Sequence, residues 1–263
     1  MKTALLISTY NWVSALKLVL KSVLEQVQLP DEILIADDGS TGETKKLIEE
    51  FKKQFSIPVR HFWHEDAGFR KSIILNKTLA ASTSDYIIQI DGDCIIHPYF
   101  IRDHIEMTEN QVFLYGSRVN IPKKGLNKVL EKEPSRFSFF SPLIKKRTRN
   151  IRLPFLRNKF EAKPDFSSKV RGCNISYWRK DFLAVNGYNE EIEGWGREDS
   201  EFIIRLLNND VNGKRLKYGG ILYHIYHEVK SREHVSANSE IQQQTIQEKK
   251  TWCEKGVDQY IEN

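Results

Sequence analysis

Two carboxylates separated by a single glycine follow an apolar run that ends at Ile90. In an extended chain, side chains two positions apart point to the same side, which would place Asp91 and Asp93 together. Carboxylate oxygens are preferred ligands of hard divalent cations, which keep further positions for phosphate oxygens and water. The Asp91-Gly92-Asp93 pattern therefore indicates a divalent metal site. The alternative is a plain turn, because Asp and Gly both tolerate turn conformations.

A second acidic pair, Asp37 and Asp38, follows the apolar run over residues 32–36. Adjacent carboxylates repel each other unless hydrogen-bond donors accompany them, and a nucleobase imide or a ribose hydroxyl is such a donor. Contact with a nucleotide is therefore one interpretation of this pair. A strand-exit turn that continues through Gly39 and Ser40 is the other.

Two cations, Arg70 and Lys71, precede a helical pattern over residues 73–81. Positive charge at the start of a helix opposes the helix dipole. A bound diphosphate would reverse that penalty, because phosphate favours both the helix N-terminus and the basic side chains. The pair therefore indicates a phosphate contact, with two solvated surface charges as the alternative.

The segment 194–201 contains the densest group of side chains able to do chemistry. Trp195 lies between two glycines, and Glu198, Asp199 and a third acid follow within a few positions. Acids in the first turn of a helix are common capping residues, which is the structural alternative. Capping does not explain the tryptophan, whose flat ring beside carboxylates is typical of a sugar platform with hydrogen-bond acceptors. One of the carboxylates could act as general base on a hydroxyl.

Two imidazoles, His224 and His227, follow a strand-like stretch over residues 220–223. A single histidine in such a sequence is more often structural. Two histidines three positions apart at a sheet edge fit a metal or phosphate site better. Neutral imidazole suits borderline divalent ions such as manganese.

The elements that must position these side chains are alternating strands and helices. Apolar runs predict strands over residues 2–9, 32–36, 59–63 and 85–90, and helical spacing predicts helices over 14–27, 44–55 and 73–81. This alternation predicts an α/β fold with a mostly parallel sheet and helices on both faces. Such sheets bind ligands beyond the carboxyl ends of their strands. The polar clusters at 8–11, 37–40 and 91–93 all fall at those ends.

Positive charge is concentrated in the segment 123–163. It contains thirteen basic and three acidic residues, a local charge of +10 in a chain of net charge +5. Large apolar residues, many of them Phe and Leu, are interleaved with the cations. This mixture favours an anionic membrane surface as partner. Nucleic acid is a rival partner, and a solvated basic loop is the structural alternative.

The composition excludes several classes of protein. With 40% hydrophobic residues the chain is too apolar to be disordered. No apolar stretch approaches the roughly 20 residues of a spanning helix, and the N-terminal run is too short for a signal peptide core. Cys94, Cys173 and Cys253 are widely spaced, so we expect free thiols in a reducing, cytoplasmic compartment.

Taken together, these segments resemble a family 2 glycosyltransferase with the Rossmann-like GT-A fold. The C-terminal half resembles the galactosyltransferase-type module of β-1,4-galactosyltransferases, polypeptide N-acetylgalactosaminyltransferases and bacterial chondroitin polymerases. The resemblance covers residues 3–120 and 170–230 and leaves out 121–169. The motifs that carry it, in order, are Ile7-Ser8-Thr9-Tyr10-Asn11, Ala36-Asp37-Asp38-Gly39-Ser40, Gly68-Phe69-Arg70-Lys71, Asp91-Gly92-Asp93, Arg171-Gly172-Cys173-Asn174, Gly194-Trp195-Gly196-Arg197-Glu198-Asp199, and His224.

The resemblance implies a role for each matching residue. The nucleotide would be held by Thr9, Tyr10, Asn11, Asp37, Asp38, Arg70, Lys71 and Asp91. The pocket for the sugar would be lined by Gly172, Trp195, Gly196 and Glu198. Asp199 matches the catalytic base of inverting galactosyltransferases. Mn²⁺ or Mg²⁺ would be bound by Asp93 and His224. Asp91 would touch either the ribose or the metal. His227, which departs from the animal members of the family, would lie beside the metal ligands.

The resemblance implies an inverting, metal-dependent enzyme that moves a hexose or N-acetylhexosamine from a UDP-sugar to a hydroxyl of a lipid-linked surface glycan. We expect one GT-A domain over 1–263. Its parts would be a nucleotide-binding half (1–120), a basic aromatic insertion (121–169), an acceptor half (170–230) and a helical tail (231–263). We expect peripheral attachment to the inner face of a membrane through 123–163, and no nucleic acid partner.

The sequence is compatible with two other functions. A sugar nucleotidyltransferase would also have a nucleotide-binding sheet and acidic metal ligands. It would need a glycine-rich phosphate loop near the N-terminus, and residues 8–14 contain no glycine. A non-catalytic UDP- or glycan-binding module would keep Asp38 and Trp195 but has no need of Asp199 beside a metal site.

Overall fold

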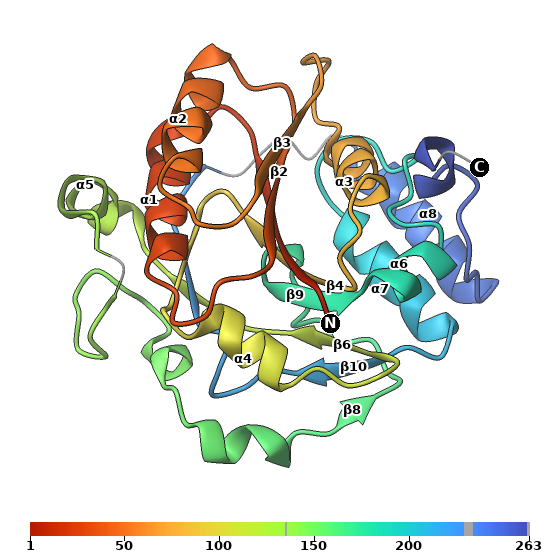
Figure 1. The fold of residues 1–263 in the computed structure, drawn as a ribbon. Helices are drawn as coiled ribbons and strands as arrows, with labels where there is room; N and C mark the ends of the chain where they lie inside the picture. The colour runs from red at the N-terminus through yellow and green to blue at the C-terminus, as the bar shows by residue number, and fades with distance from the viewer. Residues whose placement is uncertain (135, 229–233, 262–263) are drawn as a thin grey trace.

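The computed structural model of the chain describes residues 1–134, 136–228 and 234–261 (Figure 1). The N-terminal third alternates strands and helices as expected. Its elements are β1 (Thr3–Thr9), α1 (Val13–Leu24), β2 (Glu32–Asp37), α2 (Gly42–Lys52), β3 (Val59–Trp63), α3 (Lys71–Ala80) and β4 (Tyr86–Asp91). The α3 helix begins at Lys71, two residues before the expected start, so this lysine lies in its first turn.

The rest of the chain adds shorter strands, helices and 3₁₀ turns. They are β5 (Cys94–Ile96), α4 (Phe100–Glu106), β6 (Val112–Tyr115), β7 (Arg118–Asn120), α5 (Lys123–Lys132), η1 (Arg147–Asn150), η2 (Pro154–Lys159), β8 (Ala162–Lys163), η3 (Gly172–Asn174), β9 (Ile175–Trp178), α6 (Arg179–Ala184), α7 (Glu198–Asn208), β10 (Asn212–Arg215), β11 (Leu222–His224), α8 (Val235–Gln247) and η4 (Val257–Tyr260). The helix α8 lies within the segment 231–263 that was expected to form a helical tail.

An eight-stranded sheet in the order β3-β2-β1-β4-β9-β6-β10-β8 forms the centre of the molecule. Strands β1 to β4 are mutually parallel where they pair, and β6 pairs in parallel with β10. Strands β9 and β8 are antiparallel to the strands with which they pair. The expectation of an α/β fold with a mostly parallel sheet is therefore confirmed.

The two faces of this sheet bury two separate apolar layers. Alternate residues of β1 point to opposite faces, because the side chains of a strand alternate. Leu5 and Ile7 join a cluster with the apolar faces of α1, α2 and α4, whereas Ala4 and Leu6 join a cluster with α3, α6 and α7. Helices therefore cover both faces of the sheet, as expected (Figure 1).

A second, three-stranded sheet in the order β5-β11-β7 lies beyond the end of β4. Strand β11 pairs antiparallel with β5, with His224 opposite Cys94. It pairs in parallel with β7, with His224 opposite Asn120. This small sheet brings the end of β11 to the turn that follows β4, although 130 positions separate them in sequence.

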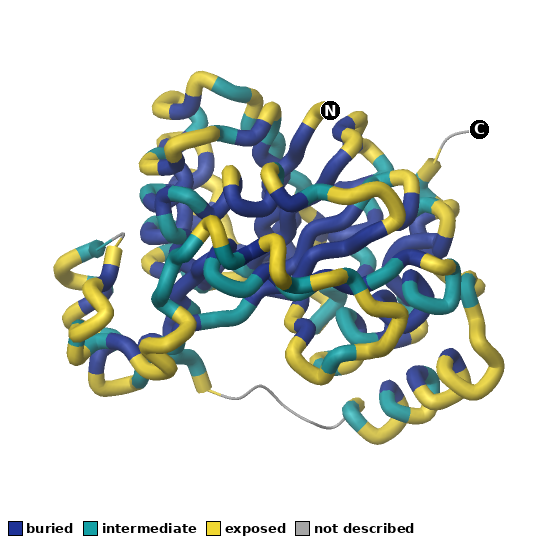
Figure 2. Tube along the Cα trace, turned by 90° about the horizontal axis from the view of Figure 1, so that it is seen from below, coloured by how far each residue is buried: buried dark blue, intermediate teal, exposed yellow. Residues whose placement is uncertain are grey.

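The described part of the basic segment 123–163 contains α5, two 3₁₀ turns and the short strand β8. The lobe that contains α5 lies at one end of the molecule in Figure 1, and the same end is mostly exposed in Figure 2. Among the described residues, no helix combines the length and the hydrophobicity that crossing a membrane requires. The three cysteines are buried free thiols, as expected.

Candidate active site

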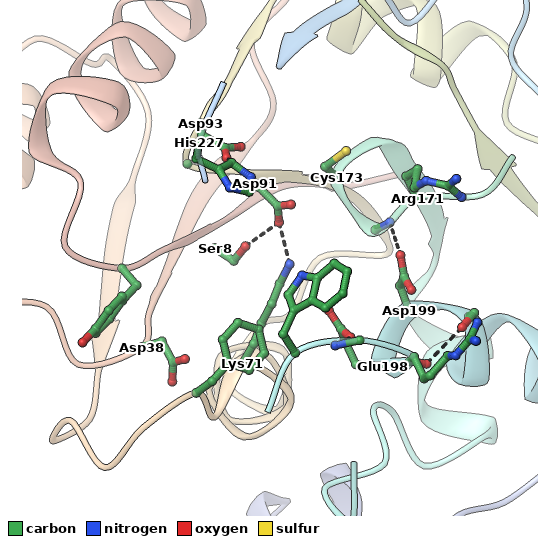
Figure 3. A pocket seen from close by; sticks show the side chains of 18 of the residues that line it. Ser8, Asp38, Lys71, Asp91, Asp93, Arg171, Cys173, Glu198, Asp199 and His227 are labelled. Carbon is green, nitrogen blue, oxygen red and sulfur yellow. Dashed lines mark hydrogen bonds and ion pairs between the residues drawn. The ribbon is translucent and has the colours of Figure 1, made fainter. Parts of the chain in front are cut away.

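A cavity of about 770 Å³ lies where β1, β4 and the start of α7 meet (Figure 3). Its volume is in the range typical of small-molecule sites. Most of the residues expected at the site line it: Thr9, Tyr10, Asp38, Lys71, Asp91, Asp93, Gly172, Trp195, Gly196, Glu198, Asp199 and His227. Residues from both halves of the chain therefore converge on one cavity.

The remaining expected residues lie close to this cavity or outside it. His224 contacts the cavity residue Asp93, with 3.7 Å between the Nε2 and Oδ2 atoms. Arg70 lines an adjoining cavity of about 490 Å³. Asn11 and Asp37 line neither cavity.

The carboxylate of Asp37 is used to build the strand exit. It accepts hydrogen bonds from the Ser40 backbone N–H at 2.9 Å and contacts the His61 ring at 2.9 Å, and the side chain is almost fully buried. Asn11 likewise fixes the facing loop, since its side-chain oxygen accepts the Thr41 N–H at 2.9 Å. The side chains of Asn11 and Asp37 are therefore engaged in contacts within the protein, and neither lines a cavity.

Asp38 does face the cavity. Its carboxylate accepts the Arg70 backbone N–H at 3.0 Å and contacts His64 Nε2 at 2.7 Å. Burial raises the pKa of Asp38, and these hydrogen bonds oppose the rise. Arg70 thus reaches Asp38 through its backbone. His64 was not expected from the sequence, because its partner Asp38 lies 26 positions away and its sequence neighbours are two other acids, Glu65 and Asp66.

The ligand atoms of Asp93, His224 and His227 all lie within 4.8 Å of one another. The register of β5 and β11 causes this, because the Ile225 N–H donates to the Asp93 carbonyl at 2.9 Å and so fixes the two segments together. His227 Nε2 lies 3.5 Å from Asp93 Oδ2. The three groups are partly buried, and Asp93 is far in the sequence from the two histidines, so the fold gathers them.

This donor set fits a divalent cation such as Mn²⁺. One carboxylate and two imidazoles combine hard and borderline ligands, and three protein ligands leave positions for phosphate oxygens. Burial lowers the pKa of His224, which favours the neutral imidazole that a metal requires. His227, expected only beside the ligands, is placed as close to Asp93 as His224 is.

Asp91 has a different partner. Its Oδ1 accepts hydrogen bonds from Lys71 Nζ at 2.6 Å and from Ser8 Oγ at 2.7 Å (Figure 3). The chain is not extended here as expected, because it turns at Gly92 and Asp93, but both carboxylates line the same cavity. Burial would raise the pKa of Asp91, but Lys71 lowers it overall. Asp91 therefore holds the lysine in place beside the metal-ligand cluster.

Asp199 approaches the cavity from the start of α7. Its Oδ2 accepts the Gly172 backbone N–H at 2.7 Å. A Cβ atom at position 172 would come within 3.1 Å of the Asp199 Cβ, so only glycine allows this approach without a shift. The carbonyl of Gly172 in turn accepts Gln89 Nε2 at 3.2 Å, and Gln89 is a buried residue of β4. The sheet therefore fixes the position of Asp199.

Glu198 lies beside Asp199 and is also buried. Its Oε2 accepts the Gly196 N–H at 3.0 Å. Burial and the neighbouring Asp199 carboxylate raise the pKa of Glu198 to about 7, while Lys71 opposes the rise. Two adjacent carboxyl groups of one helix thus stand in different environments, which is a frequent arrangement at catalytic sites.

Several residues of the cavity were not expected from the sequence. They include Ser8, Trp12, Phe69, Arg118, Phe166 and Arg171. Ser8 and Arg171 stand within or directly beside motifs that the sequence did single out, so proximity to them was an available signal. Arg118 is brought in by β7, and no local pattern marks it.

The fold resembles that of solved glycosyltransferase structures. The chain matches TarS from S. aureus with a TM-score of 0.64 and 16% identity, over 99% of this chain and 41% of that chain. It matches the mannosyltransferase PcManGT from Pyrobaculum calidifontis, solved with GDP-Man and Mn²⁺, with a TM-score of 0.58 and 14% identity, over 90% and 59%. At these identities the likeness shows the GT-A fold alone.

Curated relatives are glycosyltransferases that act in different reactions. The chain is 25% identical over 251 residues to chondroitin synthase from Escherichia coli, which covers 84% of this chain and 34% of that protein. It is 24% identical over 219 residues to validoxylamine A glucosyltransferase from Streptomyces hygroscopicus subsp. limoneus, covering 77% and 47%. The chain thus spans between a third and a half of the length of these relatives.

Two family models match the sequence and overlap. The model described as the N-terminal domain of galactosyltransferase matches residues 157–228, which include the segment with Glu198 and Asp199. The model described as glycosyl transferase family 2 matches residues 4–174, well over half of the chain, and runs through the segment 121–169 that the motifs left out. The cavity, the fold and these matches agree, and the chain belongs to glycosyl transferase family 2.

Proposed function

We propose that the chain is a metal-dependent, inverting glycosyltransferase that moves a hexose or N-acetylhexosamine from a UDP-sugar to an acceptor hydroxyl. The observation that carries this proposal is the cavity shared by Asp93, His227 and Asp199. Structures of TarS in complex with UDP and with UDP-GlcNAc support a UDP-linked donor. The relatives that synthesise chondroitin and hyaluronan support a glycan acceptor.

Asp93, His224 and His227 would hold the divalent cation, which when bound supplies Lewis-acid stabilisation of the leaving nucleotide. Lys71 would contact the diphosphate from its position in the first turn of α3. Burial alone would lower the pKa of Lys71, but Asp91, Glu198 and Asp199 raise it overall, so the ammonium stays charged. Asp38 would accept a hydrogen bond from the nucleoside, and Trp195 would pack against the sugar.

Asp199 would take the proton of the acceptor hydroxyl. The hydroxyl oxygen then forms a bond to the anomeric carbon while the bond from that carbon to the phosphate oxygen breaks, and UDP leaves with the electron pair. A single displacement inverts the configuration, so an α-linked donor yields a β-linked product. The Gly172 N–H holds one oxygen of Asp199 and leaves the other without a hydrogen-bond partner among the described residues.

We further propose that the acceptor is a lipid-linked surface glycan, such as a lipopolysaccharide, capsule or O-antigen intermediate, at the inner face of a membrane. The basic segment 123–163 supports this, because Phe140 and Phe155 are 81% and 75% exposed among cations. Flotation with anionic and neutral liposomes tests it: the anionic vesicles should retain the protein, and equal partitioning would refute the electrostatic part.

The proposal assigns a role to each part of the chain. Residues 1–120 would hold the nucleotide, 121–169 would face the membrane, 170–230 would receive the acceptor and 231–263 would form a helical tail. The boundary between the last two parts falls at 230–231, outside the described residues.

A panel of UDP-sugars tests the function directly. UDP release is measured for each donor with manganese and with EDTA. We expect slow release from one or a few donors, even to water, and its loss in EDTA. Binding of UDP with no release from any donor would favour a non-catalytic module, and formation of a UDP-sugar from UTP and a sugar phosphate would favour a nucleotidyltransferase.

A further inference from the structure

Five cations gather beside the rim of the cavity, on the side of Arg171. They are Arg118, Lys146, Arg149, Arg171 and Arg215, which we call the rim cluster. They come from β7, η1 and the residue before it, the loop before η3, and β10, so the fold and not the local sequence brings them together. Two members, Arg118 and Arg171, line the cavity itself.

Specific contacts hold the rim cluster in place. Arg149 Nη1 donates to the Arg118 carbonyl at 3.1 Å, which fixes η1 against β7. Arg215 Nη2 donates to Ser117 Oγ at 3.3 Å, next to Arg118 in the chain. Arg171 Nη1 donates to the Ser168 carbonyl at 2.8 Å. The contacts are made to neutral oxygens, so they position the guanidinium groups without neutralising them.

No member of the rim cluster forms an ion pair with a carboxylate among residues 1–134, 136–228 and 234–261. By contrast, Arg152 and Arg157 of the basic segment 123–163 form ion pairs with the buried Asp103. Burial and the other cations lower the pKa of Lys146 and of Arg149. In addition, the Nε atom of Arg215 is buried and has no hydrogen-bond partner among the described residues. A bound anion would relieve the repulsion among these cations.

The rim cluster adjoins the proposed base. Arg171 precedes Gly172, whose N–H holds the Asp199 carboxylate (Figure 3). Lys146, Arg149 and Arg215 do not line the cavity but lie near Arg118 and Arg171, so the positive charge continues beyond the cavity lining. Among the residues proposed for the donor diphosphate and its metal, Lys71, Asp93 and His227 line the cavity. A long anion bound at the rim could thus place a terminal hydroxyl near Asp199.

We propose that the rim cluster is a subsite for an acidic acceptor, a glycan that carries phosphate or carboxylate groups near the hydroxyl that receives the sugar. This inference rests on the proposed function, and it specifies the chemical class of the acceptor. Guanidinium groups bind both kinds of anion through paired N–H donors.

Calorimetric titration tests the proposal with acidic oligomers and a matched neutral one. The probes are tetragalacturonate, its fully methyl-esterified form and a glycerol phosphate tetramer. We expect the wild-type chain to bind at least one acidic oligomer, more weakly as salt rises, and the neutral ester much less. Equal binding of the ester and both acidic oligomers would overturn the proposal.

The variants Arg149→Gln and Arg215→Gln locate the binding site. We expect each to weaken binding of the acidic oligomer about tenfold. Arg147→Gln is the matched control, because Arg147 lies on the same turn and donates instead to the Ser141 carbonyl. Unchanged oligomer affinity in both rim variants would contradict the assignment.

Two further readouts separate this proposal from its rivals. UDP affinity with manganese should be the same in wild type and both variants, whereas its loss would assign the cations to the donor diphosphate. If UDP does not bind the wild-type chain at all, the proposed function fails independently of the rim cluster. Loss of binding to anionic vesicles with retention of oligomer binding would assign the cluster to a membrane surface instead.

Discussion

At the scale of single residues, the site depends on how Asp199 is held. A backbone N–H from Gly172 orients the carboxylate, and Gln89 fixes the Gly172 carbonyl from the central sheet. Both phenols of the buried pair Tyr177 and Tyr188 donate to Gln89 Oε1, at 2.8 and 2.9 Å. A chain of hydrogen bonds therefore connects the core of the protein to the proposed base.

Asp199→Asn should abolish transfer and preserve nucleotide binding. The amide oxygen can still accept the Gly172 N–H, but it cannot take a proton, so we expect turnover to fall by about 10² to 10⁴. Turnover is measured as UDP release in the presence of acceptor, and UDP affinity by calorimetry. Asp210→Asn, an exposed residue just beyond the far end of the same helix, is the control and should behave like the wild type. Near-native turnover of Asp199→Asn would show that another group is the base.

Glu198→Gln should make the metal-free, donor-free protein more stable at pH 8. The pKa of this carboxyl is raised from 4.5 to about 7 in the folded chain. Between those values the unfolded chain releases a proton that the folded chain retains, so wild-type stability falls as pH rises. The variant does not lose stability in this way. Its free energy of unfolding should therefore exceed that of the wild type by near zero at pH 4.5 and by about 3 kcal/mol above pH 7.

Urea unfolding across pH 4.5 to 8 measures this difference. Glu254→Gln is the control, because Glu254 is exposed, and its difference from wild type should not change with pH. A Glu198→Gln advantage that is constant over the range would mean that Glu198 is not buried in the way described.

At the scale of elements, the small sheet β5-β11-β7 brings the proposed metal ligands together. His224 reaches Asp93 because β11 pairs with β5, and His227 follows three residues later. The same sheet carries Arg118 of the rim cluster on β7. One supersecondary unit thus connects the proposed metal site to the proposed acceptor subsite.

His224→Ala should remove the manganese dependence of UDP binding. Losing one of three ligands weakens metal binding, and the diphosphate then gains little from added metal. Calorimetric titration of UDP with manganese and with EDTA measures the effect: the wild type should bind much more tightly with manganese, and the variant about equally in both. A variant that keeps the full manganese effect would exclude His224 as a ligand.

The basic segment is anchored by a buried ion-pair network on α4. Asp103 is fully buried and accepts hydrogen bonds from Arg152 Nη2 at 2.6 Å, Arg157 Nη1 at 2.7 Å and the Gly220 N–H at 3.0 Å. Asp103→Asn would leave Arg152 without its charged partner and Arg157 with Glu106 alone. We expect it to reduce the free energy of unfolding by about 3 to 5 kcal/mol.

Urea denaturation measures the stability of Asp103→Asn, and limited proteolysis tests whether residues 147–159 loosen first. Asp165→Asn, an exposed acid of the same region, is the control and should change stability little. Native-like stability of Asp103→Asn would show that the network does not anchor the segment.

At the scale of the whole molecule, the sequence predicts the fold well where strands are short apolar runs. β3 is found at the expected residues 59–63, and the other early strands differ by about one residue. The polar residues after β1, β2 and β4 meet because parallel strands end at one edge of the sheet. Helix ends were less well predicted. The apolar spacing predicts a helix that continues to Val27, but α1 ends at Leu24.

The rest depends on contacts between distant segments, which one sequence does not specify. The chain turns at Gly92 and Asp93, and Lys71 takes Asp91 as its partner. Asp37 is a candidate ligand residue in the sequence, but in the structure it contacts His61 on the neighbouring strand and lines neither cavity. The rim cluster was visible only in part, since Arg118, Arg171 and Arg215 lie outside the basic segment.

The configuration of the product tests the account most directly, because it depends on donor, acceptor and base meeting in one cavity. Proton NMR of a reaction between an α-linked UDP-sugar and an acceptor glycan reports the anomeric configuration as the product forms. The account predicts a β-linked product from the first turnover, formed only with divalent metal and absent with Asp199→Asn. An α-linked product would contradict it, since retention requires a different mechanism and leaves Asp199 without its proposed role.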